Sequence, residues 1–398
     1  MQQIDFSQGS IRRRILAVAT PMLIAQLLNL LYNIVDRIYI GKIPGEGTLA
    51  LASIGLCFPF VTLITAFANL FGLGGAPLCA MARGKGNREG AQGIMVNAGF
   101  MLLLSGAVLT VLGIAFHRPL LYLFGASEVT YPYASSYIVI YLLGTLCVML
   151  SLGLNPYINC QGFARIGMLT VALGAAANIV LDPIFIFALH LGVRGAAIAT
   201  LSQFLSAAWV VKFLTGKKAE LKLDFRGFCP DWHCIQHITV LGIASFVMSF
   251  TDMLVQVACN SMLRGFGGDL YISVMTVLNS VRKIAQTPVL AIADGASTAI
   301  SYNYGAGLYK RTRDAIRFMT QIAIGYTMLV WMLVSLFPAL FIRIFNQDAE
   351  LVAAAVPALH IYFFGFVMMA FQYSGQSTFR ALGRAKYAVF FSLLRKAF

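Results

Sequence analysis

Two aspartates lie inside runs so apolar that only a lipid bilayer accounts for them. Asp36 follows Leu-Leu-Tyr-Asn-Ile-Val, and Asp182 follows Ala-Ala-Asn-Ile-Val-Leu. A carboxylate at membrane depth costs roughly 2.5–3.5 kcal/mol on insertion scales, so such residues persist mainly where they bind something. We therefore expect both aspartates to belong to a binding site.

The spacing of the neighbouring polar residues indicates which chemistry such a site performs. Tyr32 and Asp36 are four residues apart, as are Asn178 and Asp182, so each pair shares one face of a helix. Thr200 follows in a stretch of small residues that permits close helix packing. All five side chains offer oxygen atoms, which suit Na⁺ or H⁺ better than a soft metal. Asp36, Asn178 and Asp182 are the candidate Na⁺ ligands.

Each of these residues also has a purely structural interpretation. Asp36 could pair with Arg37 near the helix end, although adjacent residues on a helix do not face one another. Asn178 could make only a hydrogen bond between helices.

Further polar residues fall in later apolar spans and are candidates for contacting a substrate. These are Asp252, Asn260 and Asp294. Arg282 and Lys283 are placed to pair with the two aspartates, which leaves a structural salt bridge as the alternative.

The composition is that of a polytopic membrane protein. Apolar residues make up 59% of the 398 residues and charged residues 11%, against about 25% charged in soluble domains. The mean hydropathy is +0.79. The first apolar run is too long for a signal peptide, so we expect a retained helix.

The net charge of +14 does not indicate nucleic-acid binding, because the basic residues recur in alternate loops. One set of loops holds 19 of them, including Arg12 to Arg14, and the opposite set holds 5. This positive-inside bias predicts a cytoplasmic N-terminus in the cell membrane. We expect a monomer, with no partner other than the lipid bilayer and small molecules.

The seven cysteines mostly lie in apolar runs and indicate no disulfide framework. One group, Cys229, His233, Cys234 and His237, has four possible metal ligands within nine residues. Its spacing matches no usual zinc pattern, so its role stays open.

Ten apolar stretches are long enough to span a bilayer, and an eleventh begins near residue 387. Several contain prolines, which we expect to bend or break their helices. Among these is Pro21, in the first span.

The second half of the chain repeats the first at a constant offset. Ala-Arg-Gly-Lys-Gly-Asn at 82–87 matches Asn-Tyr-Gly-Ala-Gly-Leu at 303–308, and the same offset places Gly162 on Gly383. The repeat predicts an all-α fold of two six-helix bundles related by a pseudo-twofold axis. We divide the chain into an N-terminal lobe (1–214) with the cation site, a cytoplasmic linker (215–234) and a C-terminal lobe (235–398). The second lobe would lack its last two helices, which suggests a truncated bundle.

The spans, the repeat and two motifs resemble the multidrug and toxic compound extrusion (MATE) family over essentially the whole chain. The motifs are Tyr-Asn-Ile-Val-Asp-Arg-Ile-Tyr-Ile-Gly from Tyr32 and Asn-Ile-Val-Leu-Asp-Pro-Ile-Phe from Asn178. The resemblance implies twelve helices in two lobes and Na⁺- or H⁺-driven export of cationic, amphipathic drugs.

The resemblance also implies residue roles. A cation site would use Asp36, Asn178, Asp182 and Thr200, with Tyr32 nearby. Cation binding or protonation at Asp36 would bend the first helix at Pro21 and displace substrate. The counterpart of Asp36 in the second half is Asn260, whose lack of charge argues against a matching site there.

Two other functions compete with a cation-coupled antiporter. A flippase for lipid-linked or polysaccharide precursors would use a similar scaffold but needs a basic cavity for its anionic cargo. A membrane enzyme needs a reactive constellation, and the scattered histidines form none. The sequence contains no Gly-x-x-x-x-Gly-Lys-Ser/Thr motif for ATP. We therefore predict no enzyme and no cofactor, only a coupling ion.

Overall fold

The computed structural model describes residues 3–43, 47–200, 202–345 and 348–390. It omits a few further side chains in the second and ninth helices, including that of Asn260. The candidate residue Asn260 and the last part of the predicted eleventh span therefore lie outside the described residues.

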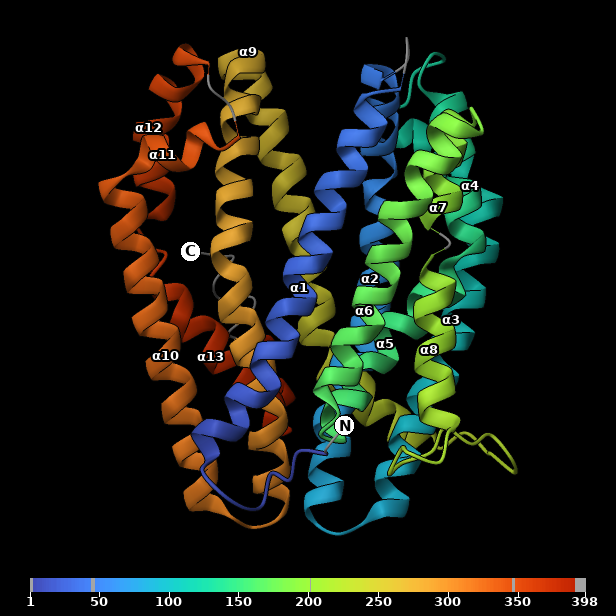
Figure 1. The fold of residues 1–398 in the computed structure, drawn as a ribbon, viewed down its shortest axis with the longest axis vertical. Coiled ribbons are helices and arrows are strands. Elements are labelled where there is room, and N and C mark those ends of the chain that lie inside the picture. Colours follow the sequence, from blue (N-terminus) through green and yellow to red (C-terminus); the bar gives the residue numbers. More distant parts are fainter. Residues whose placement is uncertain (1–2, 44–46, 201, 346–347, 391–398) are drawn as a thin grey trace.

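The described chain is built from helices joined by short loops (Figure 1). They are α1 (Ile11–Gly41), α2 (Gly47–Gly84), α3 (Arg88–Leu123), α4 (Tyr131–Leu143), α5 (Thr145–Cys160), α6 (Ala164–Pro183), the π-helical turn η1 (Ile184–Ala188), α7 (Gly192–Thr200), α8 (Gln203–Thr215), α9 (Trp232–Gly305), α10 (Tyr309–Leu336), α11 (Pro338–Arg343), α12 (Ala349–Phe363) and α13 (Met368–Ala381). Each of the ten predicted spans corresponds to one of these helices, to part of one, or to a consecutive pair. The prediction of an all-α polytopic membrane protein is confirmed.

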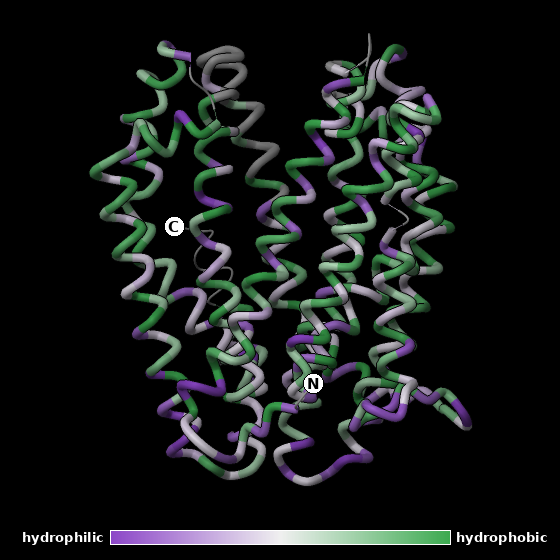
Figure 2. The backbone as a smooth tube through the Cα atoms, in the orientation of Figure 1, coloured by the Kyte–Doolittle hydropathy of each residue, from purple (hydrophilic) through white to green (hydrophobic). Residues whose placement is uncertain are grey.

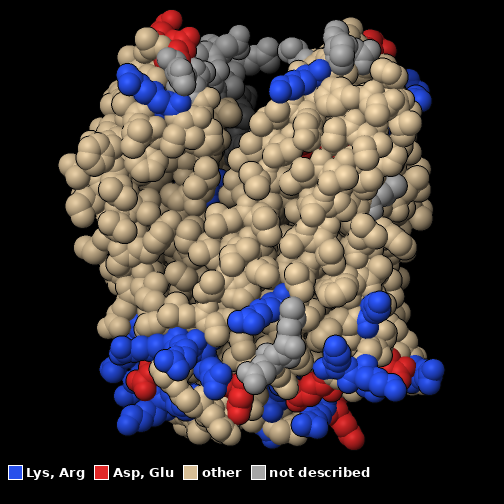
Figure 3. Space-filling model, viewed as in Figure 1, with Lys and Arg blue, Asp and Glu red and all other residues tan. Residues whose placement is uncertain are grey.

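Seven of the described helical stretches are long and apolar enough to cross a bilayer, and two bent pairs raise this number to nine. Apolar positions dominate the middle of the molecule, and hydrophilic ones gather in the loops at one end (Figure 2). The same end carries most of the basic side chains visible in Figure 3. This distribution follows the alternation of basic loops in the sequence.

Helix α9 doubles back on itself, so it supplies two of the predicted spans. Ile238 lies against Gly74 of α2, and Tyr302 lies against Gly84 of the same helix. A straight helix would place Ile238 and Tyr302 about 96 Å apart, whereas Gly74 and Gly84 are separated by only about 15 Å. Figure 1 shows the two arms of α9 side by side.

The expectation that prolines bend or break helices holds at Pro183, where α6 ends and the π-helical turn η1 begins, but the two bent helix pairs break at other residues. The α4–α5 pair bends by 55° at Gly144, and the α12–α13 pair bends by 48° between Phe363 and Met368. Helix α1 continues without interruption through Pro21. A proline removes one backbone donor, which a membrane helix tolerates when neighbouring groups satisfy the freed carbonyl.

Buried apolar residues form one large cluster in the first half of the chain and two smaller ones in the second half. A further cluster joins Ile11, Ile15 and Val18 of α1 to Ala299 of α9 and Met319 of α10. The other end of α1 packs in the first half, where Ile40 belongs to the large cluster. Helix α1 therefore crosses from one half of the molecule to the other (Figure 1).

The predicted repeat is visible in the backbone. Gly86 and Gly307 both adopt left-handed conformations, with φ of 77° and 73°, in corresponding loops. Gly162 and Gly383 do the same, with φ of 88° and 71°. Both pairs are related by the offset of the sequence repeat, and only glycine adopts this conformation without strain.

The segment between the halves is held against the first half by polar contacts. Gln161 Oε1 accepts from the Leu221 amide at 2.9 Å. Glu220 forms an ion pair with Arg83, which also donates to the Cys160 carbonyl. The division of the chain at residues 214 and 234 remains a prediction.

Candidate cation site and central cavity

The two membrane aspartates meet across neighbouring helices. Asp36 lies near the C-terminal end of α1. This helix packs against α6, which carries Asp182. Their carboxyl groups face each other within hydrogen-bonding reach. Asn178 Nδ2 donates to Asp182 Oδ1 at 3.5 Å, as the spacing of four residues predicts. Residues from distant parts of the sequence thus form one cluster.

Three oxygen atoms of this cluster are buried and have no hydrogen-bond partner within the described ranges. They are Asp36 Oδ1, Asn178 Oδ1 and Asp182 Oδ2. Asp182 is completely buried and Asn178 nearly so. Buried polar atoms are normally satisfied, so three neighbouring acceptors without a protein donor indicate a place for a proton, a cation or a water molecule. Their chemistry fits Na⁺, which takes hard oxygen ligands, and it fits H⁺ shared between two carboxylates.

The two remaining predicted residues border this cluster. Tyr32 is close enough to Asp36 and Asp182 to interact electrostatically with both. Thr200 Oγ1 donates to the Ala196 carbonyl at 3.1 Å and is in hydrogen-bonding contact with the Tyr137 side chain. Helices α1, α6 and α7 thus bring all five residues into one region.

Tyr137 and Tyr141 of α4 also belong to this region, although our sequence reasoning missed them. Both are 7% exposed, and their rings stack with centroids 6.1 Å apart. Tyr137 interacts electrostatically with Asp36, and Tyr141 with Tyr32. Their signal in the sequence was a pair of hydroxyl groups four residues apart in an apolar span.

The alternative interpretation of Asp36 is not realised. The ion pairs that the described residues form do not include one between Asp36 and Arg37. Asp36 interacts with Asp182, whereas Arg37 lines a cavity on another side of α1. Adjacent residues point in different directions on a helix, which explains the separation.

A cavity of about 640 Å³ lies between the two halves of the molecule. It is lined by side chains of α1, α2, α5, α6, both arms of α9, and α13, and a hollow between the halves opens at the end opposite the basic loops (Figure 3). Its volume is in the range of small-molecule sites. Asp36, Asn178 and Asp182 are not among its lining residues.

Both predicted substrate aspartates line this cavity. Asp294 forms an ion pair with Arg380 of α13 at 3.3 Å. Our alternative named Arg282 or Lys283 as the partner, and this was wrong for Asp294. Arg282 instead contacts Asn279 at 3.4 Å and lies over the Tyr362 ring. A partner from α13 comes from a distant part of the sequence, which local spacing does not reveal.

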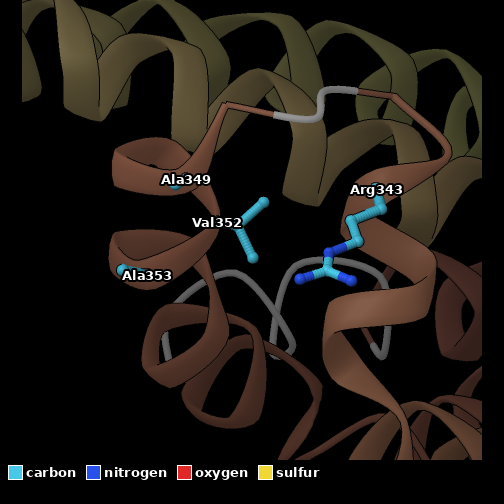
Figure 4. Close-up of a pocket in the computed structure, with 4 residues that line it drawn as sticks. All are labelled: Arg343, Ala349, Val352 and Ala353. Carbon is cyan, nitrogen blue, oxygen red and sulfur yellow. The ribbon is translucent and has the colours of Figure 1, made fainter.

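A second cavity of about 540 Å³ lies between α11 and α12. Figure 4 shows Arg343 of α11 directed toward Val352 of α12, with Ala349 and Ala353 beside it. It contains none of the predicted site residues.

The cysteine and histidine group near the start of α9 does not assemble into a metal centre. The His233 and His237 rings lie 4.5 Å apart, while Cys229 is exposed. In the part of the chain that the structure describes, no three His, Cys, Asp or Glu side chains are placed to hold a metal ion.

Comparisons with known proteins agree with this architecture. The MatE family model matches residues 21–184 and 244–396. A multidrug export protein MepA from Staphylococcus haemolyticus is 25% identical over 362 residues, covering 90% of this chain and 79% of the relative. An FAD transporter from Shewanella oneidensis is 26% identical over 354 residues, covering 85% of this chain and 75% of the relative.

Solved structures show the same fold. A MATE crystal structure in the bent conformation superposes with a TM-score of 0.92 at 25% identity, covering 99% of this chain and 87% of the other. A MATE structure in the straight conformation gives 0.91 at 25% identity, covering 99% and 88%. The family model covers well over half of the chain, in two segments that correspond to the two halves of the repeat. This chain therefore belongs to the MatE family of efflux transporters.

Proposed function

We propose that this protein is an antiporter that exports amphipathic small molecules and is driven by Na⁺ or H⁺. The observation that carries the proposal is the set of three buried oxygen atoms without donors, on Asp36, Asn178 and Asp182. Such a group accepts a proton or a small cation reversibly, which is what coupling to an ion gradient requires. Asp36, Asn178 and Asp182 would hold the cation, with Thr200 and Tyr32 beside them.

Helix α1 links the cation site to the cavity. Tyr32 and Asp36 face the cation site, whereas Asn29, Asn33 and Arg37 line the cavity. A change in charge at Asp36 therefore acts on the helix that contacts substrate. Bending at Pro21 is our prediction for the movement that follows, because proline weakens the helix at that point.

The charge of the substrate is a separate question. Cationic amphipathic drugs are the prediction from the sequence, and the name of the MepA relatives, multidrug export protein, supports it. Asp252 and Asp294 in the cavity are the residues that would contact such drugs.

A flippase for lipid-linked or polysaccharide precursors is the second candidate. One observation favours it: Arg37 and Lys283 line the cavity, and a basic cavity is what this function requires. One of the relatives is named an FAD transporter, so not every relative of this chain is named as a drug exporter.

The decisive experiment reconstitutes the protein in vesicles and imposes a Na⁺ or a pH gradient. Movement of ethidium, a cation, and of carboxyfluorescein, an anion, is followed in parallel, beside Asp36→Asn and Asp182→Asn. We expect gradient-driven movement of at least one dye, and its loss in both variants. Asp224→Asn is the matched control, because Asp224 is exposed in the loop before α9. Equal, gradient-independent leakage in all variants would reject coupling and favour the flippase.

A further inference from the structure

Two basic side chains of the described chain line the central cavity and belong to none of its ion pairs. Arg37 lies on α1 and Lys283 on the second arm of α9, and both are exposed to the cavity. Neither takes part in any ion pair or side-chain hydrogen bond found within residues 3–43, 47–200, 202–345 and 348–390. The cavity therefore presents two cations that none of the ion pairs among the described residues includes.

The acidic residues of the cavity are already engaged. Asp294 is paired with Arg380, whose guanidinium also donates to Ser245 Oγ at 3.0 Å. Asp252 interacts with a neighbouring group as well. Asp36, the acidic residue next to Arg37 in the sequence, contacts Asp182 and acts on Arg37 only through longer-range electrostatics. Among the described charged side chains that line the cavity, the basic ones, Arg37, Lys283 and Arg380, outnumber the acidic ones, Asp252 and Asp294.

Arg37 and Lys283 act on each other electrostatically, and because both are cations the interaction is repulsive. Like charges near one another in a membrane protein are unfavourable unless a counter-charge lies between them. A guanidinium and an ammonium group are the side chains that recognise carboxylate, sulfonate and phosphate groups. The pair is thus arranged for an anion.

The surroundings of the pair define the rest of the ligand. Gln286 lines the cavity nearby, and its side-chain amide can donate hydrogen bonds. Leu30, Met248 and Leu290 contribute apolar surface to the same cavity. A ligand that fits both features has an anionic group and an apolar body.

We propose that Arg37 and Lys283 form a binding site for the anionic group of an amphipathic substrate. This inference rests on the proposed transport function and specifies its substrate class. The anion would bridge α1 and α9, so its binding would act on the same helix that carries Asp36. Substrate and coupling ion would then influence each other through α1.

The test measures binding to the purified protein at equilibrium, without any gradient, by fluorescence anisotropy. Carboxyfluorescein is the anionic probe and ethidium the cationic one. We expect carboxyfluorescein to bind wild type, and Arg37→Gln and Lys283→Gln each to weaken it at least tenfold. Neither variant should weaken ethidium binding. Carboxyfluorescein binding that is unchanged in both variants, or binding of ethidium alone, would overturn the proposal.

Arg282→Gln is the matched control, because Arg282 is adjacent to Lys283 but lies over Tyr362 outside the cavity lining. It should change carboxyfluorescein affinity less than twofold. Arg37→Lys and Lys283→Arg should retain most of the binding, which distinguishes charge recognition from a loss of folding. Asp36→Asn tests coupling separately, in the vesicle assay. The binding assay uses no gradient, so its result can be interpreted even if the vesicle assay shows no coupling.

Competition identifies the source of the anion. Farnesyl diphosphate, a lipid phosphate, and naphthalene sulfonate, a soluble organic anion, are added at equal concentrations against bound carboxyfluorescein. Displacement by either supports the site, and the stronger competitor identifies the preferred class. Displacement by neither would contradict it.

Discussion

Gly84 and Gly305 occupy equivalent positions in the two halves, and each lies directly against the backbone of the other half. A side chain at Gly84 would overlap the carbonyl of Tyr302, and one at Gly305 would overlap the carbonyl of Met81. Met81 and Tyr302 are themselves related by the offset of the repeat, as the two glycines are. The contact is therefore reciprocal, as a pseudo-twofold axis requires.

This contact closes the basic end of the molecule, and it predicts the effect of Gly84→Ala. The added methyl group would overlap backbone atoms at Tyr302, which cannot move aside as a side chain can. Helices α2 and α9 would therefore have to separate. We expect the packed arrangement of the two helices to be destabilised by about 1–3 kcal/mol. A cysteine introduced near Gly84 should then react faster with a labelling reagent. Gly325→Ala is the control, because nothing lies within 4 Å of its position. Equal labelling in both variants would contradict a tight contact at Gly84.

Asn178→Ala should change the ion concentration that transport requires, in a direction that depends on the coupling ion. The substitution removes one of three unpartnered oxygens and the hydrogen bond to Asp182. A polar contact to a charged group is worth roughly 1.5–3 kcal/mol, so for Na⁺ the loss of the Oδ1 ligand should raise the concentration for half-maximal transport at least tenfold. For H⁺ the loss of a donor to the Asp182 carboxylate favours its protonated form, so half-maximal transport should shift to higher pH. The measurement is efflux against a series of imposed Na⁺ or pH gradients. Asn33→Ala, on the cavity side of α1, should leave this ion dependence unchanged.

Glu220→Gln should destabilise the first half of the protein. Glu220 is the ion-pair partner of Arg83, whose side chain is only 6% exposed. The glutamine oxygen can still accept a hydrogen bond, but the largely buried guanidinium loses its counter-charge and keeps only neutral acceptors such as the Cys160 carbonyl. We expect a loss of about 1–3 kcal/mol, read as a lower thermal midpoint in detergent. Glu89→Gln, an exposed change in α3, should shift the midpoint less.

The pair Asp294 and Arg380 should behave as a unit. Arg380→Gln leaves Asp294 without its partner inside the cavity, so this single change should destabilise strongly. Adding Asp294→Asn removes the unpaired charge and should recover part of the stability. Thermal midpoints of the two single variants and the double variant measure the coupling energy. Strictly additive effects would show that the pair contributes no interaction of its own.

The sequence alone determined the class of fold and which residues of the site share a helix face. Hydrophobic stretches of spanning length, alternate basic loops and a repeat at constant offset predict paired helical bundles because the bilayer constrains length, charge and backbone bonding. The pairs Tyr32/Asp36 and Asn178/Asp182 followed from helical periodicity, which is a local property.

Contacts between distant segments were decided only by the tertiary structure. The approach of Asp36 to Asp182, the engagement of Asp294 by Arg380, and the contribution of Tyr137 all depend on how helices pack. The bend at Gly144 lies inside a single predicted span and was likewise not predicted, whereas the doubling back of α9 agrees with the two spans predicted there. Helical spacing defines which residues share a face, but packing between helices selects what that face meets.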